Sequence, residues 1–204
     1  MKTRFNDTGG LRIRTGAMLA ATAMLAGCIS IGGDPPDKLL TLTAANTASA
    51  GTGANGSEAN AIALVEFEAP ARLDVLRVPV QINDSELAYL KDATWVERPS
   101  RLFRRVIAET LRSRTSRVVI DGDDPGAAAT TRLTGVVRDF GYDARTSSVV
   151  VRFDAIRTDG EGAGVTTRRF EAVVPGITPE SGPVGEALNQ AANQVAGEVA
   201  AWLL

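Results

Sequence analysis

Apolar and polar residues alternate along three stretches in the second half of the chain, which predicts three consecutive β-strands. The stretches cover residues 130–142, 148–158 and 165–174. Alternation with a period of two places every second side chain on the same face, as a strand with one buried face requires. Gly, Asp and Ser residues separate the stretches, so we expect hairpin connections. The alternation places Val136, Phe140 and Tyr142 on one face of the first stretch. In the second stretch, Val149, Val151, Phe153 and Ala155 alternate with Val150, Arg152, Asp154 and Ile156.

Shorter apolar runs predict further strands earlier in the chain. They cover residues 39–43, 62–67, 73–82, 87–90 and 117–120. Pro79 lies inside the third run. Because proline has no N–H to donate to a neighbouring strand, it indicates an edge strand or a bulge at this point.

Two segments have helical periodicity instead. The first, about residues 97–114, repeats Leu102, Phe103, Val106, Ile107 and Leu111 at intervals of three and four. Pro99 suits its first turn, although Thr94 and Glu97 have the spacing of a capping box and leave the start open by a few residues. The second covers about residues 182–203, with Val184, Leu188, Ala191, Val195, Val199 and Trp202 on one face. Together the patterns predict an α+β fold, a mostly antiparallel sheet packed by two helices.

The N-terminus has the pattern of a secretory signal. Lys2, Arg4, Arg12 and Arg14 precede an apolar run over residues 16–25, and small residues then precede Cys28. Leu25-Ala26-Gly27-Cys28 resembles the bacterial lipobox, whose cysteine is diacylated on sulfur, freed by cleavage and acylated on its new amine. The resemblance implies cleavage between Gly27 and Cys28 and a lipid anchor on Cys28.

Two other interpretations of this segment fit less well. A buried free cysteine in a soluble protein would leave the order of basic, apolar and small residues unexplained. A transmembrane helix needs roughly 20 apolar residues, about twice the length of this run.

The chain therefore divides into a signal and one domain. We expect residues 1–27 to be removed, residues 28–38 to form a lipidated tether and residues 39–204 to form a single α+β domain. Within that domain, residues 44–60 are of low complexity and predict a flexible insertion with no apolar face to bury. This insertion contains a G-x-G-x-x-G match at residues 51–56, but no strand precedes it and no helix opens inside it, so a dinucleotide site is not indicated.

Composition narrows the chemistry. The 204 residues carry a net charge of −2, with no histidine and one cysteine. Histidine-dependent catalytic triads and imidazole-based zinc sites are therefore excluded, and nothing favours nucleic acid. A serine–lysine mechanism would need Lys38 or Lys91, and nothing in the sequence brings the nearby Ser85 to Lys91. We expect no catalytic residue, no cofactor and no metal site.

Several segments beyond the lipobox carry a family resemblance. They are Leu76-Arg-Val-Pro-Val80, Leu87-Ala-Tyr-Leu90, Trp95-Val-Glu-Arg-Pro99, Leu133-Thr-Gly-Val136 with Asp139-Phe140, and the alanine-rich segment that ends in Trp202-Leu203. In this order they resemble the ABC-type transport auxiliary lipoproteins, a family that includes the PqiC-type components of MCE lipid-transport systems.

The resemblance implies a non-catalytic lipoprotein that is anchored in the outer membrane and faces the periplasm. Its implied partners are a periplasmic MCE-domain protein with an ABC permease and ATPase, which move lipids or other hydrophobic compounds across the envelope. A homo-oligomer is left open. Ile29 follows the cysteine, and in enterobacteria the absence of aspartate there favours the outer membrane. The alternative is a structural or assembly lipoprotein that binds other envelope proteins or the cell wall.

Four residues are candidates for a partner or lipid interface: Trp95, Arg101, Arg104 and Arg105. Trp95 suits a half-wet rim, but an aromatic residue at a helix entrance is more often core, so packing between helix and sheet is the favoured interpretation. The arginines lie opposite the apolar face of the first predicted helix. They could contact anionic lipid head groups, or they could form an ordinary solvated face, which is favoured.

Overall fold

The computed structural model describes residues 38–54, 57, 60–122, 129–160 and 164–204. Gly27, Cys28, the expected signal peptide and all of the tether except Lys38 lie outside these residues. The described elements form the α+β fold that the sequence predicts. In chain order they are β1 (Ile62–Leu64), β2 (Arg77–Gln81), β3 (Leu87–Thr94), α2 (Pro99–Arg112), β4 (Val119–Asp121), β5 (Thr131–Asp143), β6 (Ser148–Asp159), β7 (Val165–Pro175) and α3 (Ser181–Leu203). Neither described helix has the length and apolar character needed to cross a membrane.

Strand β5 is the centre of the mixed sheet. Along one edge it pairs antiparallel with β6 over its whole length, and β6 pairs antiparallel with β7. Its other edge pairs in parallel with β1 near its beginning and with β2 near its end. Strand β4 adds to β1 in parallel, and β3 adds to β2 antiparallel. The three predicted hairpin strands are thus confirmed, and the parallel pairs are an addition that local alternation could not show.

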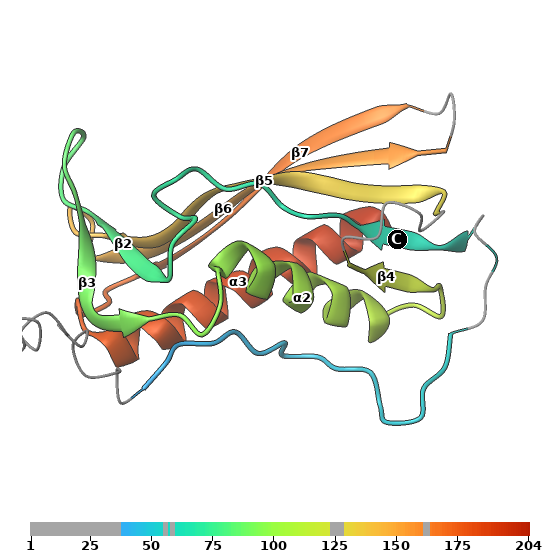
Figure 1. Cartoon of the computed structure of the whole chain (residues 1–204), viewed down its shortest axis with the longest axis horizontal. Coiled ribbons are helices and arrows are strands. Elements are labelled where there is room, and N and C mark those ends of the chain that lie inside the picture. The colour runs from blue at the N-terminus through green and yellow to red at the C-terminus, as the bar shows by residue number, and fades with distance from the viewer. Residues whose placement is uncertain (1–37, 55–56, 58–59, 123–128, 161–163) are drawn as a thin grey trace, which may run out of the picture. The chain divides into compact units, whose positions relative to one another are not determined.

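Both helices cover the same face of the sheet (Figure 1). Helix α3 contacts β5, β6 and β7, while α2 packs against α3 and β4. Phe103 fixes α2 to the core, because its ring centroid lies 6.2 Å from that of Phe67, 5.9 Å from that of Phe140 and 5.5 Å from that of Phe153. Helix α2 begins at Pro99, and its N-cap residue makes no side-chain capping bond, so the proline rather than the capping-box spacing marks the start.

A β-bulge in β5 corrects the prediction that Val136 shares a face with Phe140 and Tyr142. The pairing with β6 shifts register between Val137 and Asp139, which leaves Arg138 as an extra residue. Val137 is fully buried on the same face as Phe140 and Tyr142, whereas Val136 lies on the opposite face, beside Asp154 and Ile156. The bulge also turns Arg138 and Asp139 outward together, which simple alternation forbids.

Pro79 lies in an interior strand, so the edge-strand alternative is wrong and the bulge alternative is right. Strand β2 runs between β3 and β5, and its pairing with β3 is irregular between Arg77 and Pro79. Gly141 of β5 faces this point, where a Cβ atom would lie 2.4 Å from the carbonyl oxygen of Pro79. The glycine is what lets the two strands approach.

The segment before β1 differs from both predictions made for it. Residues 39–43 form a single bridge instead of a strand: Leu40 N–H donates to Thr94 O at 2.7 Å, and Val96 N–H donates to Leu40 O at 2.9 Å. The chain then runs beside the helices (Figure 1). The N–H groups of Thr43, Ala45 and Ala48 donate to Asn189, Asn193 and Glu109 respectively, at 2.7–2.8 Å. The beginning of the predicted insertion is therefore attached to the helices by side-chain acceptors.

Gly135 provides a test of the close packing between β5 and β6. A Cβ atom there would lie 2.4 Å from Asp154 O and 2.6 Å from the Phe153 ring, so Gly135→Ala must displace one of them. We expect Gly135→Ala to lower the free energy of unfolding by about 1–3 kcal/mol in urea denaturation. Gly164→Ala, where a Cβ meets nothing within 4 Å, is the control and should be unchanged or slightly stabilised. Equal stability of the two variants would contradict the packing argument.

Candidate functional site

Trp95, the first interface candidate, lies in the core. Its side chain is 1% exposed, and its ring meets that of Phe140 edge-on with centroids 5.8 Å apart. The structure therefore agrees with the packing interpretation, and the indole offers no surface to a lipid or a partner.

Arg104 corrects the expectation of a solvent-facing arginine run on α2. Its side chain is only 8% exposed, and its Nε lies 2.8 Å from Asp121 Oδ1, on a side chain that is 12% exposed. Asp121 ends β4, against which α2 packs, so the strand end brings a carboxylate to the guanidinium. A buried charge requires such a partner.

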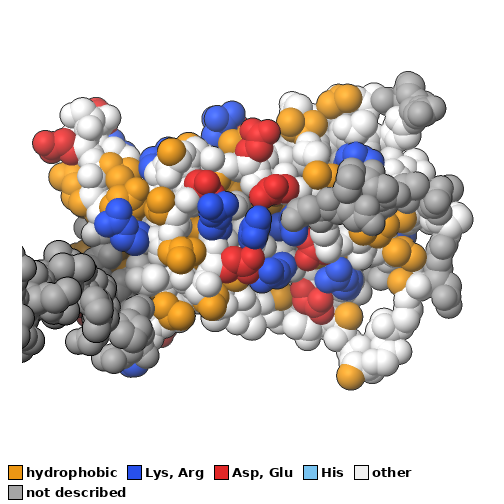
Figure 2. All heavy atoms as spheres, in the orientation of Figure 1, with side chains coloured by type: hydrophobic (Ala, Val, Ile, Leu, Met, Phe, Trp, Pro, Cys, Tyr) orange, Lys and Arg blue, Asp and Glu red, His pale blue; other side chains and the backbone are white. Residues whose placement is uncertain are grey.

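The other two candidates are exposed, but each has an acidic partner. Arg101 lies 3.6 Å from Glu66, and Arg105 Nη2 donates to Glu97 Oε1 at 3.1 Å. Figure 2 shows basic and acidic side chains mixed on the face that α2 presents. This balance of charge favours an ordinary solvated helix face over a surface that selects anionic lipids.

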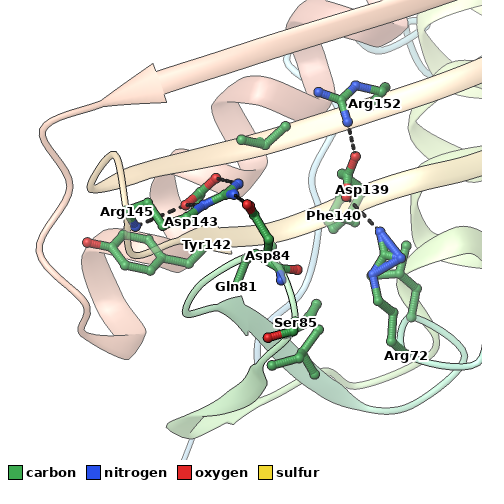
Figure 3. A pocket seen from close by; sticks show the side chains of 15 residues that line it. Arg72, Gln81, Asp84, Ser85, Asp139, Phe140, Tyr142, Asp143, Arg145 and Arg152 are labelled. Atoms are coloured by element: carbon green, nitrogen blue, oxygen red, sulfur yellow. Dashed lines mark hydrogen bonds and ion pairs between the residues drawn. The ribbon is translucent and has the colours of Figure 1, made fainter.

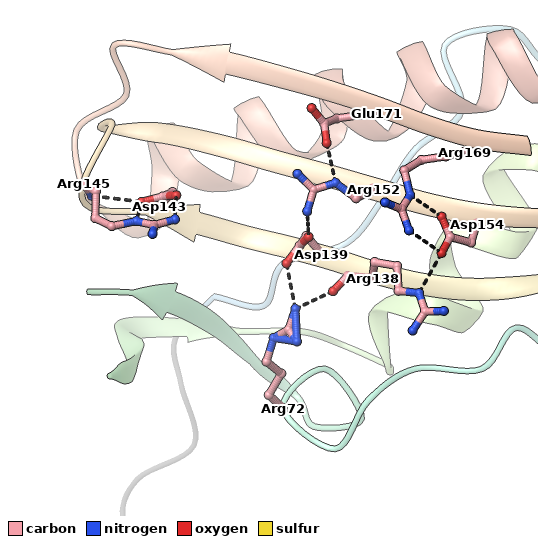
Figure 4. A network of polar contacts seen from close by, with 9 residues as sticks. All are labelled: Arg72, Arg138, Asp139, Asp143, Arg145, Arg152, Asp154, Arg169 and Glu171. Carbon is pink, nitrogen blue, oxygen red and sulfur yellow. Dashed lines mark hydrogen bonds and ion pairs between the residues drawn. The ribbon is translucent and has the colours of Figure 1, made fainter. Parts of the chain in front are cut away.

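A denser set of charges lies on the other face of the sheet, away from the helices, where cross-strand register aligns opposite charges. Asp139 of β5 pairs with Arg152 of β6, which pairs in turn with Glu171 of β7. Arg152 forms ion pairs with both of these carboxylates. Arg72, from the loop before β2, adds to the row, because its Nη2 lies 2.7 Å from Asp139 Oδ1 (Figure 4).

Asp154 of β6 is the centre of a second row. Arg169 of β7 holds it with two bonds, Nε to Oδ1 at 2.6 Å and Nη2 to Oδ2 at 2.8 Å. Arg138, the bulge residue of β5, donates from Nε to Oδ2 at 2.8 Å. The hydrogen bonds from Arg169 and then Arg138 lower the pKa of Asp154 to about 2, against a partial opposing effect of burial. The carboxylate is therefore ionised at neutral pH.

Hollows open beside these rows, and two of them are lined by Asp139 and its partners Arg72 and Arg152. The larger, about 500 Å³, lies between the β2–β3 turn and the facing ends of β5 and β6 (Figure 3). Arg145 bridges Asp143 and Asp84 on its wall, and its hydrogen bond lowers the pKa of Asp143. The second, about 350 Å³, is called here the arginine hollow. It is lined by Pro70, Arg72, Arg138, Asp139, Arg152 and Arg169.

The chemistry available on this face is binding by charge and hydrogen bonds. Within the described residues no three acidic or thiol side chains gather as metal ligands. Ser85 Oγ hydrogen-bonds Asn83, and Lys91 Nζ lies 3.9 Å from Asp92. Neither contact joins Ser85 to Lys91 as a serine–lysine mechanism would require. Guanidinium groups, by contrast, are well suited to bind oxyanions.

Alternation along β6 predicts that Arg152 and Asp154 share the face opposite Val151 and Phe153, and it indicates no role for them. Arg72, Arg138, Arg169 and Glu171 were not singled out. One signal in the sequence could have indicated these ion pairs: opposite charges recur at every second position of strands that are predicted to be neighbours. The loop residue Arg72 carried no signal, since only the tertiary structure brings it to β5.

The chain belongs to the family described as the ABC-type transport auxiliary lipoprotein component, which it matches over residues 40–200. The family resemblance seen in the sequence is thereby confirmed. The chain is accordingly assigned to a class of transport-associated lipoproteins, and no curated protein matches it.

Two solved structures have the same fold. Protein XCC0632 from Xanthomonas campestris, of family DUF330, is 18% identical, with a TM-score of 0.67 over 81% of this chain and 94% of its own. An uncharacterized protein is 14% identical, with a TM-score of 0.64 over 81% and 97%. The PelC dodecamer from Paraburkholderia phytofirmans is less similar, at 15% identity and a TM-score of 0.40 over 72% and 91%.

Asp154 gives a test of the second row through pH. Its pKa is about 2 in the folded chain against an ordinary value of 3.8, so its ion pairs stabilise the fold fully above about pH 4 and lose this effect as the pH falls toward 2. We expect Asp154→Asn to lower the free energy of unfolding at pH 7 and to flatten its decline between about pH 4 and 2 in urea titrations. The exposed Glu186→Gln removes the same charge and should keep the wild-type profile. Parallel profiles of Asp154→Asn and wild type would contradict the role of the row.

Proposed function

We propose that this chain is a non-catalytic auxiliary lipoprotein of an ABC/MCE-type transporter, which moves lipids or other hydrophobic compounds across the cell envelope. It would be anchored in the outer membrane through acyl chains on Cys28, with the domain facing the periplasm. The observation that carries this proposal is the family match over residues 40–200, which begins twelve residues after the lipobox cysteine.

The attachment of the first described residues supports a position near the membrane. Leu40 is bonded to Thr94 and Val96, and the chain is held against α3 from Thr43 onward. Lys38 follows Cys28 by ten residue steps, and a fully extended chain of that length spans at most about 35 Å. An anchor on Cys28 would keep this end of the domain within that distance of the bilayer surface.

We propose binding and positioning, and no reaction, because of the residues that the chain contains. Binding and positioning need only a rigid domain, exposed recognition groups and an anchor, all of which the chain and its lipobox can supply. The alternative is an assembly lipoprotein that binds other envelope proteins or cell wall. It would use the same anchor, but it would have different partners.

The anchor is tested by replacing its sulfur. We expect Cys28→Ser to remain uncleaved and unacylated, because the oxygen cannot replace the thiol in this processing, and to lose firm membrane attachment through acyl chains. Intact-mass measurement and membrane fractionation after an alkaline wash check both. Ser30→Ala is the matched control and should be processed normally. Wild-type protein that carries no acyl mass would contradict the anchor.

The choice of membrane is tested at the next residue. We expect Ile29→Asp in an enterobacterial host to shift the protein toward the inner membrane.

The partners are tested by affinity purification of the full chain from detergent-solubilised envelopes. We expect an MCE-domain protein with its permease and ATPase to co-purify, and deletion of the chain to change envelope lipid balance and solvent resistance. A control bait that fuses residues 1–38 to an unrelated soluble domain should recover none of them. Recovery of barrel-assembly components or peptidoglycan would instead favour the alternative function.

A further inference from the structure

The arginine hollow concentrates positive charge on a protein whose net charge is −2. Four arginines line it with one carboxylate, that of Asp139. Both oxygens of Asp139 are already engaged, one by Arg72 and the other by Arg152. Asp154 and Glu171 also pair with Arg138, Arg169 and Arg152 from beside the hollow, so the four arginines face three carboxylates and an excess of one positive charge remains at neutral pH. On the exposed face of α2, by contrast, Glu66 and Glu97 balance Arg101 and Arg105.

The guanidinium groups are held in place and still have donors to offer. Arg138 and Arg169 are held by Asp154, and their side chains remain 51% and 62% exposed. Each guanidinium has five N–H donors, and within the described part of the chain Arg138 uses only Nε. Because the carboxylates fix these side chains beforehand, a ligand would lose little rotamer entropy by binding them.

Phosphate is the anion that fits such an arrangement. Planar guanidinium forks donate two parallel hydrogen bonds to phosphate oxygens, and charge-assisted bonds of this kind are roughly twice as strong as neutral ones. The bulge in β5 is essential here, since it turns Arg138 outward beside Asp139 and brings its fork to the hollow.

An apolar surface continues from the hollow along the same face. A third hollow of about 440 Å³ shares Arg138 and Arg169 with the arginine hollow, and Val136 and Ile156 contribute half-buried apolar side chains to it beside the polar Asp154, Thr167 and Arg168. A free phosphate ion would leave this surface unused. A phosphoester that carries a glycerol and acyl chains would place its anionic group among the arginines and its apolar part over Val136 and Ile156.

We propose that the arginine hollow is a binding site for a phosphoester anion, and that the phosphate of an anionic glycerophospholipid is its source. The choice of a lipid rests on the proposed transport function as well as on the adjoining apolar surface. The phosphate chemistry itself rests only on the four arginines and their geometry.

The test uses the full lipidated chain in a non-ionic detergent with three soluble probes in calorimetric titrations. The probes are dihexanoyl phosphatidylglycerol, inorganic phosphate and dihexanoylglycerol, which lacks phosphate. We expect the phospholipid to bind saturably, inorganic phosphate to bind more weakly and dihexanoylglycerol not to bind. Arg138→Gln should weaken phospholipid binding at least about tenfold, the loss expected for one charge-assisted contact.

Arg132→Gln is the matched control, because Arg132 is an exposed arginine on the same strand and lies outside the hollow. It should leave the affinity unchanged within about twofold, a margin well below the tenfold loss above. Arg138→Gln keeps the Arg169–Asp154 pair, so its unfolding transition should remain cooperative. Should it fail to fold, Arg169→Gln is the second variant, with the same expected loss of binding.

Three results would overturn the site: no saturable binding of either phosphate-bearing probe, equal weakening by Arg132→Gln, or equal binding of dihexanoylglycerol. Equal affinities for inorganic phosphate and phospholipid would keep the phosphate site and overturn the lipid as its source. None of these results touches the anchoring or co-purification outcomes, so failure of this site and failure of the transport function are distinguishable.

Discussion

The pairing of β5 along both of its edges is the constraint on which the rest of the sheet depends. Strands β1 and β4 join the antiparallel meander only through the first part of β5, and β2 and β3 join it only through the last part. Two glycines permit close approach to β5: a Cβ atom at Gly141 would collide with the Pro79 backbone of β2, and one at Gly135 would collide with Asp154 and Phe153 of β6. One strand therefore fixes the position of every other strand.

The bulge at Arg138 then determines what each face of the sheet presents. It restores Phe140 and Tyr142 to the helix-covered side after Val137, so the core continues along the whole strand. On the open side it brings Arg138 and Asp139 together, and the ion-pair rows of β5, β6 and β7 follow. The same local irregularity thus completes the core and builds the arginine hollow.

The two charged regions of the molecule have different physical roles. The buried pair of Arg104 and Asp121 satisfies charges where α2 meets the end of β4, and removal of one partner would leave the other uncompensated. On the open face, carboxylates hold exposed arginines in position, and these arginines have further N–H groups that can donate hydrogen bonds. Under the proposed anchoring and the proposed phosphate site, such a domain could present a head group without any catalytic machinery.

The sequence by itself determined the number, order and approximate bounds of the long strands and both helices, because periods of two and of about 3.6 residues are local properties of the chain. Short segments of sequence, which are also local, carried the resemblance to the lipobox and to the family. Only the tertiary structure decided that β1 and β2 share an edge of β5, that Arg104 is buried, and that residues 43–48 attach to α3 and α2. It also decided that Arg72, from the loop before β2, shares the carboxylate of Asp139 with Arg152 of β6. Register, bulges and contacts between distant segments depend on how whole elements pack, and no local pattern records them.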